Sequence, residues 1–502
     1  MQKRETWGSR TGFIMAAVGS AIGLGNIWRF PYMVYANGGG AFLIPYFVAM
    51  LAAGIPFMIL EFGLGQKFKG SAPQVFASIS KRWEWLGWWQ VAVSFIITTY
   101  YAVVIAWSIN YFLLSFTQGW GATPKAFFFG TFLAATDSPL QLGGVRPAIL
   151  ATTAVTWFLT FIAVFTGVKS GIERMSKIFM PLLFLLVFIF IGRGLMLPGA
   201  AEGLNWLFKP NFSAIMDGKV WADAFGQIFY SLSIGFGIML SYASYLPKKS
   251  DINNNACMTV FINCGFSVIS GIMIFSVLGY MAQQQGVPIS KVAGSGVGLA
   301  FITLPTAINL MSAPVFFGTL FFLALCVAGL SSMISLNEVV VAALIEKMNI
   351  SRKKAAILFS CLGFLVSCAF ATGSGVLLLD IVDHFINNFG VLIGAFIEIL
   401  FVTWFCNIDD LRRHINRTSD IKVGALWTVS LRFITPAMLG FMLVSNCIGD
   451  IEKNYGGYST KATLLFGWST LFLCILCAMI FPRRDYAFAT IKDVNRSFLK
   501  RR

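Results

Sequence analysis

Long hydrophobic stretches recur along the whole chain and are separated by short polar segments. Each stretch reaches or approaches the roughly 20 residues that an α-helix needs to cross about 30 Å of hydrocarbon. The stretches are continuously apolar rather than alternating at every second position, which favours helices over a β-barrel. We therefore predict an all-α membrane protein with twelve transmembrane helices, at about residues 11–35, 40–66, 88–118, 147–168, 172–194, 221–247, 256–285, 314–346, 354–371, 376–405, 423–447 and 461–481.

The composition agrees with a chain that lies in a lipid bilayer. Of the 502 residues, 57% are hydrophobic and 12% are charged, which is about half the charged fraction of a soluble domain. The net charge of +16 would suggest a nucleic-acid partner in a soluble protein. Here, most Lys and Arg residues lie in the termini and in the loops on the same side of the predicted bilayer. The positive-inside rule makes that side cytoplasmic. We expect a multi-pass protein of the cell membrane with both termini cytoplasmic and no nucleic-acid partner.

Residues for enzymatic or transition-metal chemistry are scarce. The chain has nine cysteines, which lie mostly in predicted spans and form no CxxC pair, and only two histidines, His384 and His414. A membrane enzyme would need a nucleophile–base pair or a metal cluster. The sequence offers neither, so we expect no enzyme, no structural disulfide and no transition-metal site.

Glycine and polar residues interrupt the first and sixth predicted spans. The first span carries GSAIGLGN at 19–26, and the sixth carries SLSIGFG at 231–237. Glycine costs about 1 kcal/mol per helical position relative to alanine, and unwound backbone at membrane depth is tolerated where it lines a protein cavity. Close helix packing is the alternative interpretation. Two clusters at corresponding positions of spans 1–5 and 6–10 instead favour the broken helices of a secondary transporter.

An unwound stretch exposes both kinds of backbone dipole. Free N–H groups near Leu24 and Gly25 suit a carboxylate. Freed carbonyl groups suit a dehydrated cation, and the candidates are those of Gly19, Ala21 and Ile22. Uncharged oxygen ligands in other spans are supplied by Asn263, Ser331 and Ser332. The predicted site therefore binds a hard monovalent cation and a carboxylated solute.

Several motifs resemble those of the neurotransmitter:sodium symporter family, and of its bacterial amino-acid transporters, such as the leucine transporter, most of all. The motifs lie between about residues 4 and 445 and include GLGNIWRFPY, NGGGAF, SGIERMSKIFMP, QIFYSLSIGFG and AGLSSMISL. The resemblance implies a single transporter domain over 1–502 with a five-plus-five inverted repeat and broken helices 1 and 6. The first repeat would span 11–194, the second would span 221–405, and helices 11 and 12 would follow at 423–481.

The resemblance also implies two sodium ions. The first would bind to the substrate carboxylate and to Ala21, Asn26, Ser231 and Asn263. The second would bind to the carbonyl groups of Gly19, Ile22 and Ala328 and to the hydroxyl groups of Ser331 and Ser332. The leucine transporter has threonine where this chain has Ser231 and Ser331, and either residue provides a hydroxyl group.

The implied substrate site lies beside these ions. The carboxylate would meet the N–H groups near Leu24 and Gly25 and the hydroxyl of Tyr101, and the amino group would meet the carbonyls of Ala21, Tyr230 and Ser231. The side-chain pocket would consist of Ile97, Tyr101, Tyr230, Ser233, Phe236, Ser332 and Leu336. Monoamine transporters of the family have aspartate where this chain has Gly23. An amine without its own carboxylate would leave the first sodium one ligand short, so we expect a neutral, hydrophobic L-amino acid. The pattern does not separate leucine-like, alanine-like and aromatic side chains.

Charge balance suggests a bound anion. A zwitterion with two sodium ions brings two unpaired positive charges into a low-dielectric site, which is costly. Many bacterial relatives carry an acid one turn after the asparagine of span 7, where this chain, like chloride-dependent animal members, has Ser267. We hypothesise a chloride ion held by Tyr46, Gln227, Ser231, Asn263 and Ser267. The alternative is that Ser267 only hydrogen-bonds within its own helix.

Charged residues near the span ends are the candidates for gates. The resemblance implies an outer gate formed by Arg29 and Asp383, and an inner gate formed by Arg4 and Trp7 with Glu346. A solvated or snorkelling role is the usual alternative for such charges. A channel, and a family member that senses amino acids without transporting them, are the alternative functions. The sequence predicts no oligomeric state.

Overall fold

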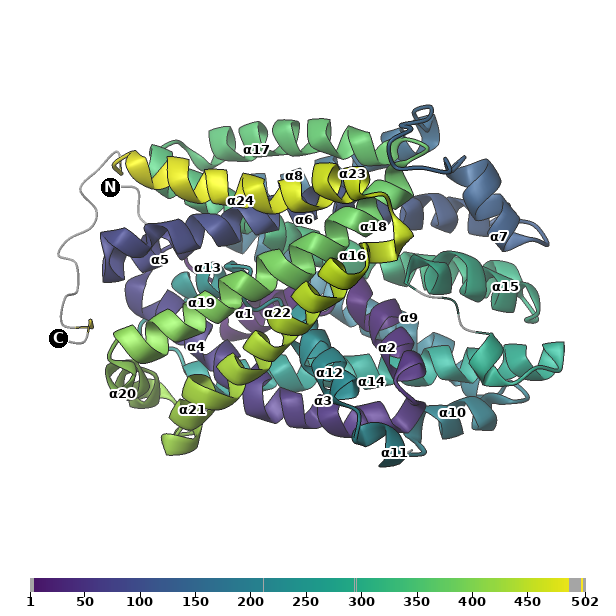
Figure 1. The fold of residues 1–502 in the computed structure, drawn as a ribbon, viewed down its shortest axis with the longest axis horizontal. Coiled ribbons are helices and arrows are strands. Elements are labelled where there is room, and N and C mark those ends of the chain that lie inside the picture. The colour runs from purple at the N-terminus through teal and green to yellow at the C-terminus, as the bar shows by residue number, and fades with distance from the viewer. Residues whose placement is uncertain (1–3, 211, 293, 295, 487–497, 500–502) are drawn as a thin grey trace.

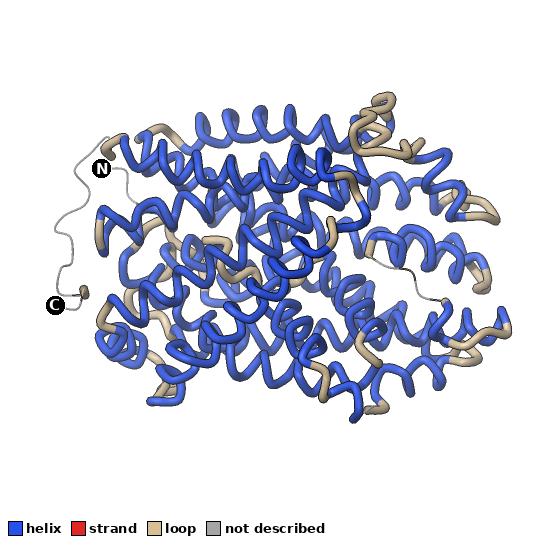
Figure 2. Tube along the Cα trace, viewed as in Figure 1, coloured by secondary structure: helices blue, strands red, loops and turns tan. Residues whose placement is uncertain are grey.

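The computed structural model describes residues 4–210, 212–292, 294, 296–486 and 498–499. Within these residues the chain forms helices, two isolated β-bridges and no strand. The helices form one bundle, with the described segments nearest to both termini at the same end (Figures 1 and 2). The prediction of an all-α protein is confirmed for the described part of the chain.

Among the described residues, ten helices are long and apolar enough to cross a membrane, and a bent helix pair, Arg10–Ala21 with Gly25–Ala36, makes an eleventh candidate. The ten are Gly39–Phe68, Lys81–Ser115, Pro147–Phe165, Val168–Leu195, Ile252–Gln285, Pro314–Met348, Arg352–Ala371, Gly375–Phe405, Ala425–Gly457 and Thr460–Arg483. The sixth predicted span consists of two helices, α12 (Gly218–Ser231) and α13 (Ile238–Ser244), which are each too short to cross a bilayer alone. The count of twelve stays a prediction.

Within the apolar segments the α-helices, as labelled in Figure 1, are α1 (Arg10–Ala21), α2 (Phe30–Ala36), α3 (Leu43–Ala49), α4 (Ile55–Phe68), α6 (Glu84–Ser115), α8 (Pro147–Phe165), α9 (Arg174–Leu195), α14 (Ile252–Gln285), α16 (Pro314–Met348), α17 (Arg352–Ser367), α18 (Gly375–Phe385), α19 (Leu392–Leu400), α21 (Ala425–Val429), α22 (Thr435–Glu452), α23 (Thr460–Ala462) and α24 (Ser469–Ile480). Shorter helices in the connections are α5 (Ala72–Ile79), α7 (Pro124–Ala126), α10 (Ala200–Phe208), α11 (Phe212–Ile215), α15 (Leu304–Asn309) and α20 (Ile408–Thr418). Helices α6 and α16 pack along each other at the centre, and α1 packs against α16, α9 and α14.

The outer surface of the bundle carries large apolar side chains that the fold does not cover. Leu185 of α9, Leu365 of α17 and Phe472 of α24 are all exposed. A continuous apolar surface of this kind is costly in water and suits contact with lipid. The exposed positions therefore agree with the membrane location that the hydrophobic pattern predicts.

The first helix break lies between α1 and the helical segment that begins at Gly25. The two halves meet at an angle of 54°. Ile22 directly after α1 has an extended backbone, with φ −78° and ψ 100°. The glycine-rich sequence allows the chain to leave and re-enter the helix here, because glycine contributes little to helix stability.

The second break covers residues 232–237, between α12 and α13. Gly235 and Gly237 adopt positive φ values of 82° and 76°, which a residue with a Cβ atom rarely adopts. The Gly235 N–H, released from the helix, donates to the buried Glu61 Oε1 at 3.0 Å. The glycine pattern thus coincides with helix breaks in both segments.

A short piece of the C-terminal region packs against the end of the bundle that holds the termini. Phe498 is buried, and its ring lies 5.4 Å from the ring of Phe68 between centroids. Its carbonyl accepts from the Asn407 N–H at 2.7 Å, and Leu499 forms an isolated bridge with Cys406. This piece therefore connects the end of α4 with the segment that follows α19.

Candidate functional site

A cavity of about 50 Å³ lies where the two helix breaks meet α6 and α16. It is lined by Ser20, Ala21, Gly23, Gly25, Asn26, Ile97, Tyr101, Tyr230, Ser231, Ser233, Phe236, Ile238, Ser332 and Leu336. Every residue expected for the substrate, except Leu24, is in this set. Ser20 and Ile238 also line the cavity, and the sequence analysis did not include them.

One end of the cavity presents main-chain N–H groups beside a phenol. The Leu24 N–H donates to the Tyr101 hydroxyl at 3.3 Å, and the Gly23 N–H donates to Asn26 Oδ1 at 3.0 Å. A Cβ atom at Gly23 would lie 2.6 Å from Ser332 Oγ and 3.1 Å from the Tyr101 hydroxyl oxygen. Only glycine therefore leaves this end open to a ligand.

Replacing Gly23 with alanine is expected to weaken ligand binding about ten- to hundredfold, because overpacking of this kind costs about 1–3 kcal/mol. Isothermal titration of the purified protein measures the change. Gly265→Ala is the matched control, since a Cβ atom there meets nothing within 4 Å. Equal affinities of the two variants would contradict a ligand site at Gly23.

Oxygen atoms predicted for the second sodium lie together between α1 and α16. Ser332 Oγ lies 3.5 Å from the Gly19 carbonyl oxygen and 3.4 Å from that of Ile22. The Ser331 hydroxyl donates to the Ala328 carbonyl at 2.8 Å. The Ser20 carbonyl, which the sequence analysis missed, lies 3.2 Å from Ser332 Oγ. This set contains only uncharged oxygens, the ligand type that hard cations prefer.

The side chains predicted for the first sodium form one hydrogen-bonded cluster. The Asn26 amide donates to Asn263 Oδ1 and to Ser267 Oγ, both at 2.9 Å. The Asn263 amide donates to Ser231 Oγ at 2.6 Å. The cluster is buried and joins the first break to α12 and α14. The Ala21 residue of the same predicted set lines the cavity.

Two of the residues predicted for chloride carry buried donors without a partner among the described residues. These donors are the Tyr46 hydroxyl and Gln227 Nε2. Gln227 Oε1 accepts from Arg29 Nη1 at 3.3 Å, which leaves the amide N–H₂ free to face another group. Unsatisfied buried donors are rare in proteins. The Tyr46 side chain also lies next to Ser231 and Ser267, so these neutral groups form a set that fits an anion.

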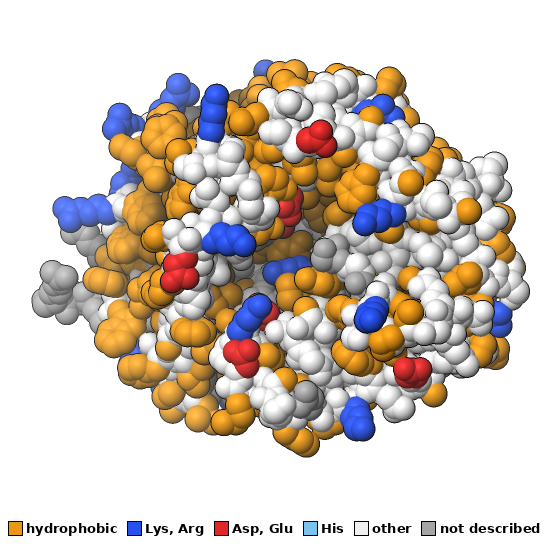
Figure 3. Space-filling model, turned by 45° about the vertical axis from the view of Figure 1, so that its right-hand side comes forward, with side chains coloured by type: hydrophobic (Ala, Val, Ile, Leu, Met, Phe, Trp, Pro, Cys, Tyr) orange, Lys and Arg blue, Asp and Glu red, His pale blue; other side chains and the backbone are white. Residues whose placement is uncertain are grey.

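The end of the bundle opposite the termini has a hollow in its surface, with acidic and basic side chains in and around it (Figure 3). The residues predicted for the outer gate, Arg29 and Asp383, each contact other side chains. Arg29 bonds to Gln227 and lies 4.3 Å from the centroid of the Tyr230 ring. Asp383 accepts from the Tyr100 hydroxyl at 2.6 Å and from Asn387 at 2.8 Å. Each charge thus has its own partners, and the structure shows no ion pair between Arg29 and Asp383, which are both described.

The residues predicted for the inner gate meet at the end that holds the termini. Arg4 forms an ion pair with Glu346, whose other oxygen accepts from the Ser71 N–H at 2.9 Å. The Trp7 indole donates to the Tyr242 carbonyl at 2.8 Å. Burial disfavours the charged guanidinium, but Glu346, Tyr245 and Glu338 together outweigh burial and raise the pKa of Arg4. These contacts close the bundle at this end.

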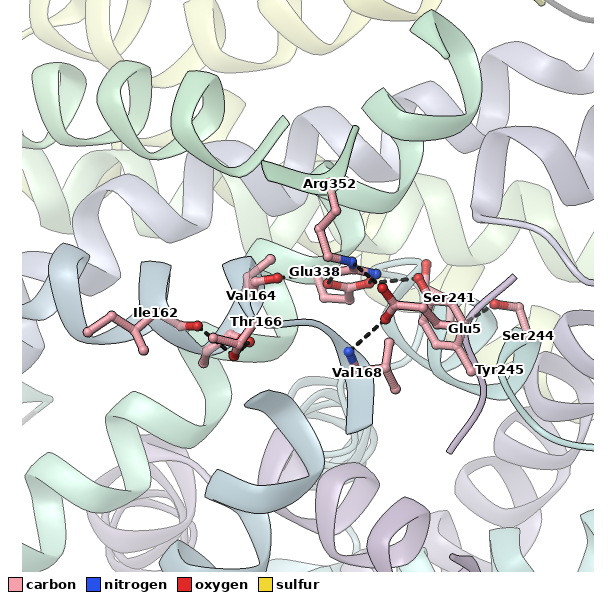
Figure 4. A network of polar contacts seen from close by, with 11 residues as sticks. Glu5, Ile162, Val164, Thr166, Val168, Ser241, Ser244, Tyr245, Glu338 and Arg352 are labelled. Carbon is pink, nitrogen blue, oxygen red and sulfur yellow. Dashed lines mark hydrogen bonds and ion pairs between the residues drawn. The ribbon is translucent and has the colours of Figure 1, made fainter. Parts of the chain in front are cut away.

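A second polar network at the same end was missed in the sequence (Figure 4). Glu338 is fully buried in α16, and its carboxylate forms two bonds with Arg352, at 2.6 and 2.9 Å. The Tyr245 hydroxyl also donates to Glu338, at 2.6 Å. Glu5 accepts from Arg352 at 2.9 Å and from the Val168 N–H at 2.7 Å. An acid within a long apolar run, as at Glu338, is the sequence signal that indicates such a network.

Comparison with known proteins shows the family and the fold of this chain. A model of the sodium:neurotransmitter symporter family matches residues 4–125 and 121–486. The crystal structure of MhsT in complex with L-phenylalanine is similar in fold, with a TM-score of 0.76 and 35% identity. The match covers 88% of this chain and all of that chain.

Curated relatives extend over nearly the whole sequence. An uncharacterised sodium-dependent transporter of Methanocaldococcus jannaschii is 44% identical over 96% of this chain and 98% of its own length. The sodium-dependent serotonin transporter of Drosophila melanogaster is 30% identical over 97% of this chain and 83% of its own length. With the family model, these matches identify the chain as a multi-pass membrane transporter rather than an enzyme, and it belongs to the sodium:neurotransmitter symporter family.

Proposed function

We propose that this protein is a sodium-coupled symporter for a neutral, hydrophobic L-amino acid, working by alternating access. The observation that carries this proposal is the cavity between the two helix breaks. The N–H groups of Leu24 and Gly25, at the first helix break, suit a carboxylate. The cavity borders the oxygen-rich clusters around Asn26 and Ser332, which suit cations.

Two sodium ions would drive uptake by direct ligation. The first would bind to Ala21, Asn26, Ser231, Asn263 and the substrate carboxylate, and the second to Gly19, Ile22, Ala328, Ser331 and Ser332. Since the carboxylate completes the first site, substrate and sodium each raise the affinity for the other by the same factor. That linkage couples the two fluxes.

The lining of the cavity supports an amino acid with an apolar side chain. Ile97, Phe236 and Leu336 form an apolar wall, while Ser233 and Ser332 add hydroxyl groups. MhsT, which is similar in fold, was crystallised with L-phenylalanine. This chain has Gly23 where monoamine transporters of the family have aspartate. A monoamine would therefore leave the first sodium without a carboxylate ligand.

A chloride ion at Tyr46, Gln227, Ser231, Asn263 and Ser267 would offset the charge of the second sodium. The support is the pair of buried unpartnered donors at Tyr46 and Gln227. Both side chains are neutral, so an anion gains hydrogen bonds without displacing an existing ion pair.

The proposed cycle uses the contacts at both ends of the bundle. Arg29 and Asp383 would approach each other when the outer side closes over Tyr230, and Arg4 would leave Glu346 when the inner side opens. We infer twelve spans, an inverted repeat of 11–194 and 221–405, and helices 11 and 12 at 423–481. Both termini would be cytoplasmic, because most Lys and Arg residues lie on their side.

Purified protein is expected to bind a hydrophobic L-amino acid only when sodium and chloride are both present. Scintillation-proximity binding across the twenty amino acids, in sodium chloride, sodium gluconate and potassium chloride, measures this. Binding in both sodium salts would retain the symporter and remove the chloride site. Binding of no amino acid would contradict the substrate assignment.

Uptake into proteoliposomes separates transport from sensing. A sodium gradient is expected to accumulate the bound amino acid in a saturable way, and dissipating the gradient is expected to abolish accumulation. Binding without accumulation would support the sensor alternative instead.

A further inference from the structure

Helix α18, which carries Asp383, is tied to α22 at the outer end of the bundle. His384 Nε2 lies 2.8 Å from Asp450 Oδ2 of α22. The two side chains are only 13% and 11% exposed, so water screens the contact weakly. The proposed function leaves this histidine without a role.

Aromatic residues after α22 strengthen the same connection. The Tyr455 ring stacks on the His384 ring, with 3.6 Å between the centroids and 13° between the planes. The hydroxyl groups of Tyr455 and Tyr458 donate to the two carboxylate oxygens of Asp380, at 3.0 and 2.9 Å. Three side chains outside α18, those of Asp450, Tyr455 and Tyr458, therefore contact Asp380 and His384 of this helix.

Solvent reaches the histidine from the outer side. A cavity of about 520 Å³ opens at this position and is lined by His384, Ser445, Asn446, Gly449, Asp450, Lys453, Asn454, Tyr455, Gly456 and Gly457. Imidazole is the side chain whose charge ordinarily changes between pH 5 and 8. A proton from the external medium can therefore reach a group suited to bind it.

The hydrogen bonds identify which proton would be added. His384 Nδ1 lies 2.8 Å from Asn388 Nδ2, and with the amide in this orientation Nδ1 is an acceptor. The neutral ring then carries its proton on Nε2 and donates it to Asp450. The contact with the Asp450 carboxylate is already charge-assisted, and a second proton on Nδ1 would turn it into an ion pair that the low exposure of both side chains strengthens. The Asn388 amide would have to rotate and present its oxygen.

Charged and phenolic groups from three parts of the chain lie around the imidazole. Asp450 and Lys453 face it from the end of α22, and Asp380 and Asp383 lie on α18 itself. Tyr455 and Tyr458 face it from the loop after α22 as neutral phenols.

We propose that His384 is an external proton-binding site that controls closure of the outer gate. Protonation tightens the contact of α18 with α22 and keeps Asp383 on its own partners, Tyr100 and Asn387, away from Arg29. External acid then slows the closing step. This inference rests on the proposed transport function, because it concerns the gate of that cycle.

Sodium-driven uptake into oriented proteoliposomes tests the proposal. Lowering the external pH from about 7.5 to about 5.5, with the internal pH held constant, is expected to reduce the initial rate about threefold. His384→Gln is expected to abolish this dependence. The matched control is His414→Gln, the other histidine of the chain, on α20 at the opposite end, where it contacts Gln66. This variant is expected to keep the wild-type response.

A second measurement does not depend on transport. Hydrogen exchange over residues 375–391, corrected for the intrinsic effect of pH, is expected to slow about threefold at pH 5.5 relative to pH 7.5. Both His384→Gln and Asp450→Asn are expected to remove the slowing, and His414→Gln is expected to retain it. Sodium-dependent ligand binding by each variant shows that it is folded.

The outcomes separate the two proposals. If hydrogen exchange slows at low pH in a protein that transports nothing, the result would support the proton-binding site and contradict the proposed symport function. Retained acid sensitivity in His384→Gln, or no effect of external pH on the wild type, would overturn the proton site. Loss of the response in His414→Gln would assign the effect to the other end of the molecule.

Discussion

Replacing Ser267 with glutamate is expected to make sodium-driven uptake independent of chloride. Ser267 is fully buried and accepts from the Asn26 amide at 2.9 Å, inside the cluster proposed for the ions. A carboxylate at this position would supply the negative charge that the bound chloride is proposed to supply. The unpartnered donors of Tyr46 and Gln227 would then bond to the new side chain. The effect is measured as the ratio of the uptake rate in chloride to the uptake rate in gluconate. This ratio is expected to be at least about ten for the wild type and about one for the glutamate variant.

Ser267→Ala is the control for this substitution. It removes one hydrogen bond and adds no charge, so the chloride requirement is expected to remain. The half-saturating chloride concentration is expected to rise about tenfold, because a hydrogen bond to a charged group contributes about 1.5–3 kcal/mol. A glutamate variant that still needs chloride would argue against an anion at Ser267.

Replacing Glu338 with glutamine is expected to destabilise the closed inner end of the protein by about 3–5 kcal/mol. The change removes the negative charge that Arg352 contacts through two bonds and leaves a guanidinium with 13% exposure beside a neutral amide. The Tyr245 hydroxyl also loses its charged acceptor. The protein is expected to unfold at lower temperature in detergent and to populate states open to the inner side.

A double substitution and a milder variant separate a lost ion pair from a general packing defect. Glu338→Gln with Arg352→Gln is expected to recover part of the stability, because no uncompensated charge then remains buried. Glu5→Gln is expected to cost about 1 kcal/mol or less, since the Glu5 side chain is 39% exposed. Equal losses in Glu338→Gln and Glu5→Gln would contradict the importance of the buried pair.

The helix breaks were predictable because glycine makes them visible in one local stretch of sequence. Gly235 and Gly237 have positive φ values, and Gly23 leaves no room for a Cβ atom. Residues beside the breaks line the cavity, since a break exposes its own backbone. Ser233 also has a positive φ, of 53°, and a serine in the sequence does not predict this conformation.

Contacts between distant parts of the chain were less predictable. Arg352, which contacts Glu338, also contacts Glu5 near the start of the chain. Composition alone does not predict which residues make such a contact. The partners of Asp383 are a further case, because Tyr100 lies on α6, far from α18 in the sequence. Hydrophobic periodicity indicates where a helix lies and does not indicate which polar groups meet between helices.

Main-chain atoms form much of the proposed ion and substrate environment at the first break. The carbonyl groups of Gly19, Ser20 and Ile22 surround Ser332 Oγ, and the Leu24 N–H faces Tyr101. No side-chain substitution deletes a carbonyl, so these proposed ligands are inherited with the fold. Evolution can therefore exchange the side chains of Ile97 or Leu336 to change the solute while the energy source remains the same. With main-chain groups binding the ions and side chains selecting the solute, one ancestral backbone can diversify into transporters of different solutes.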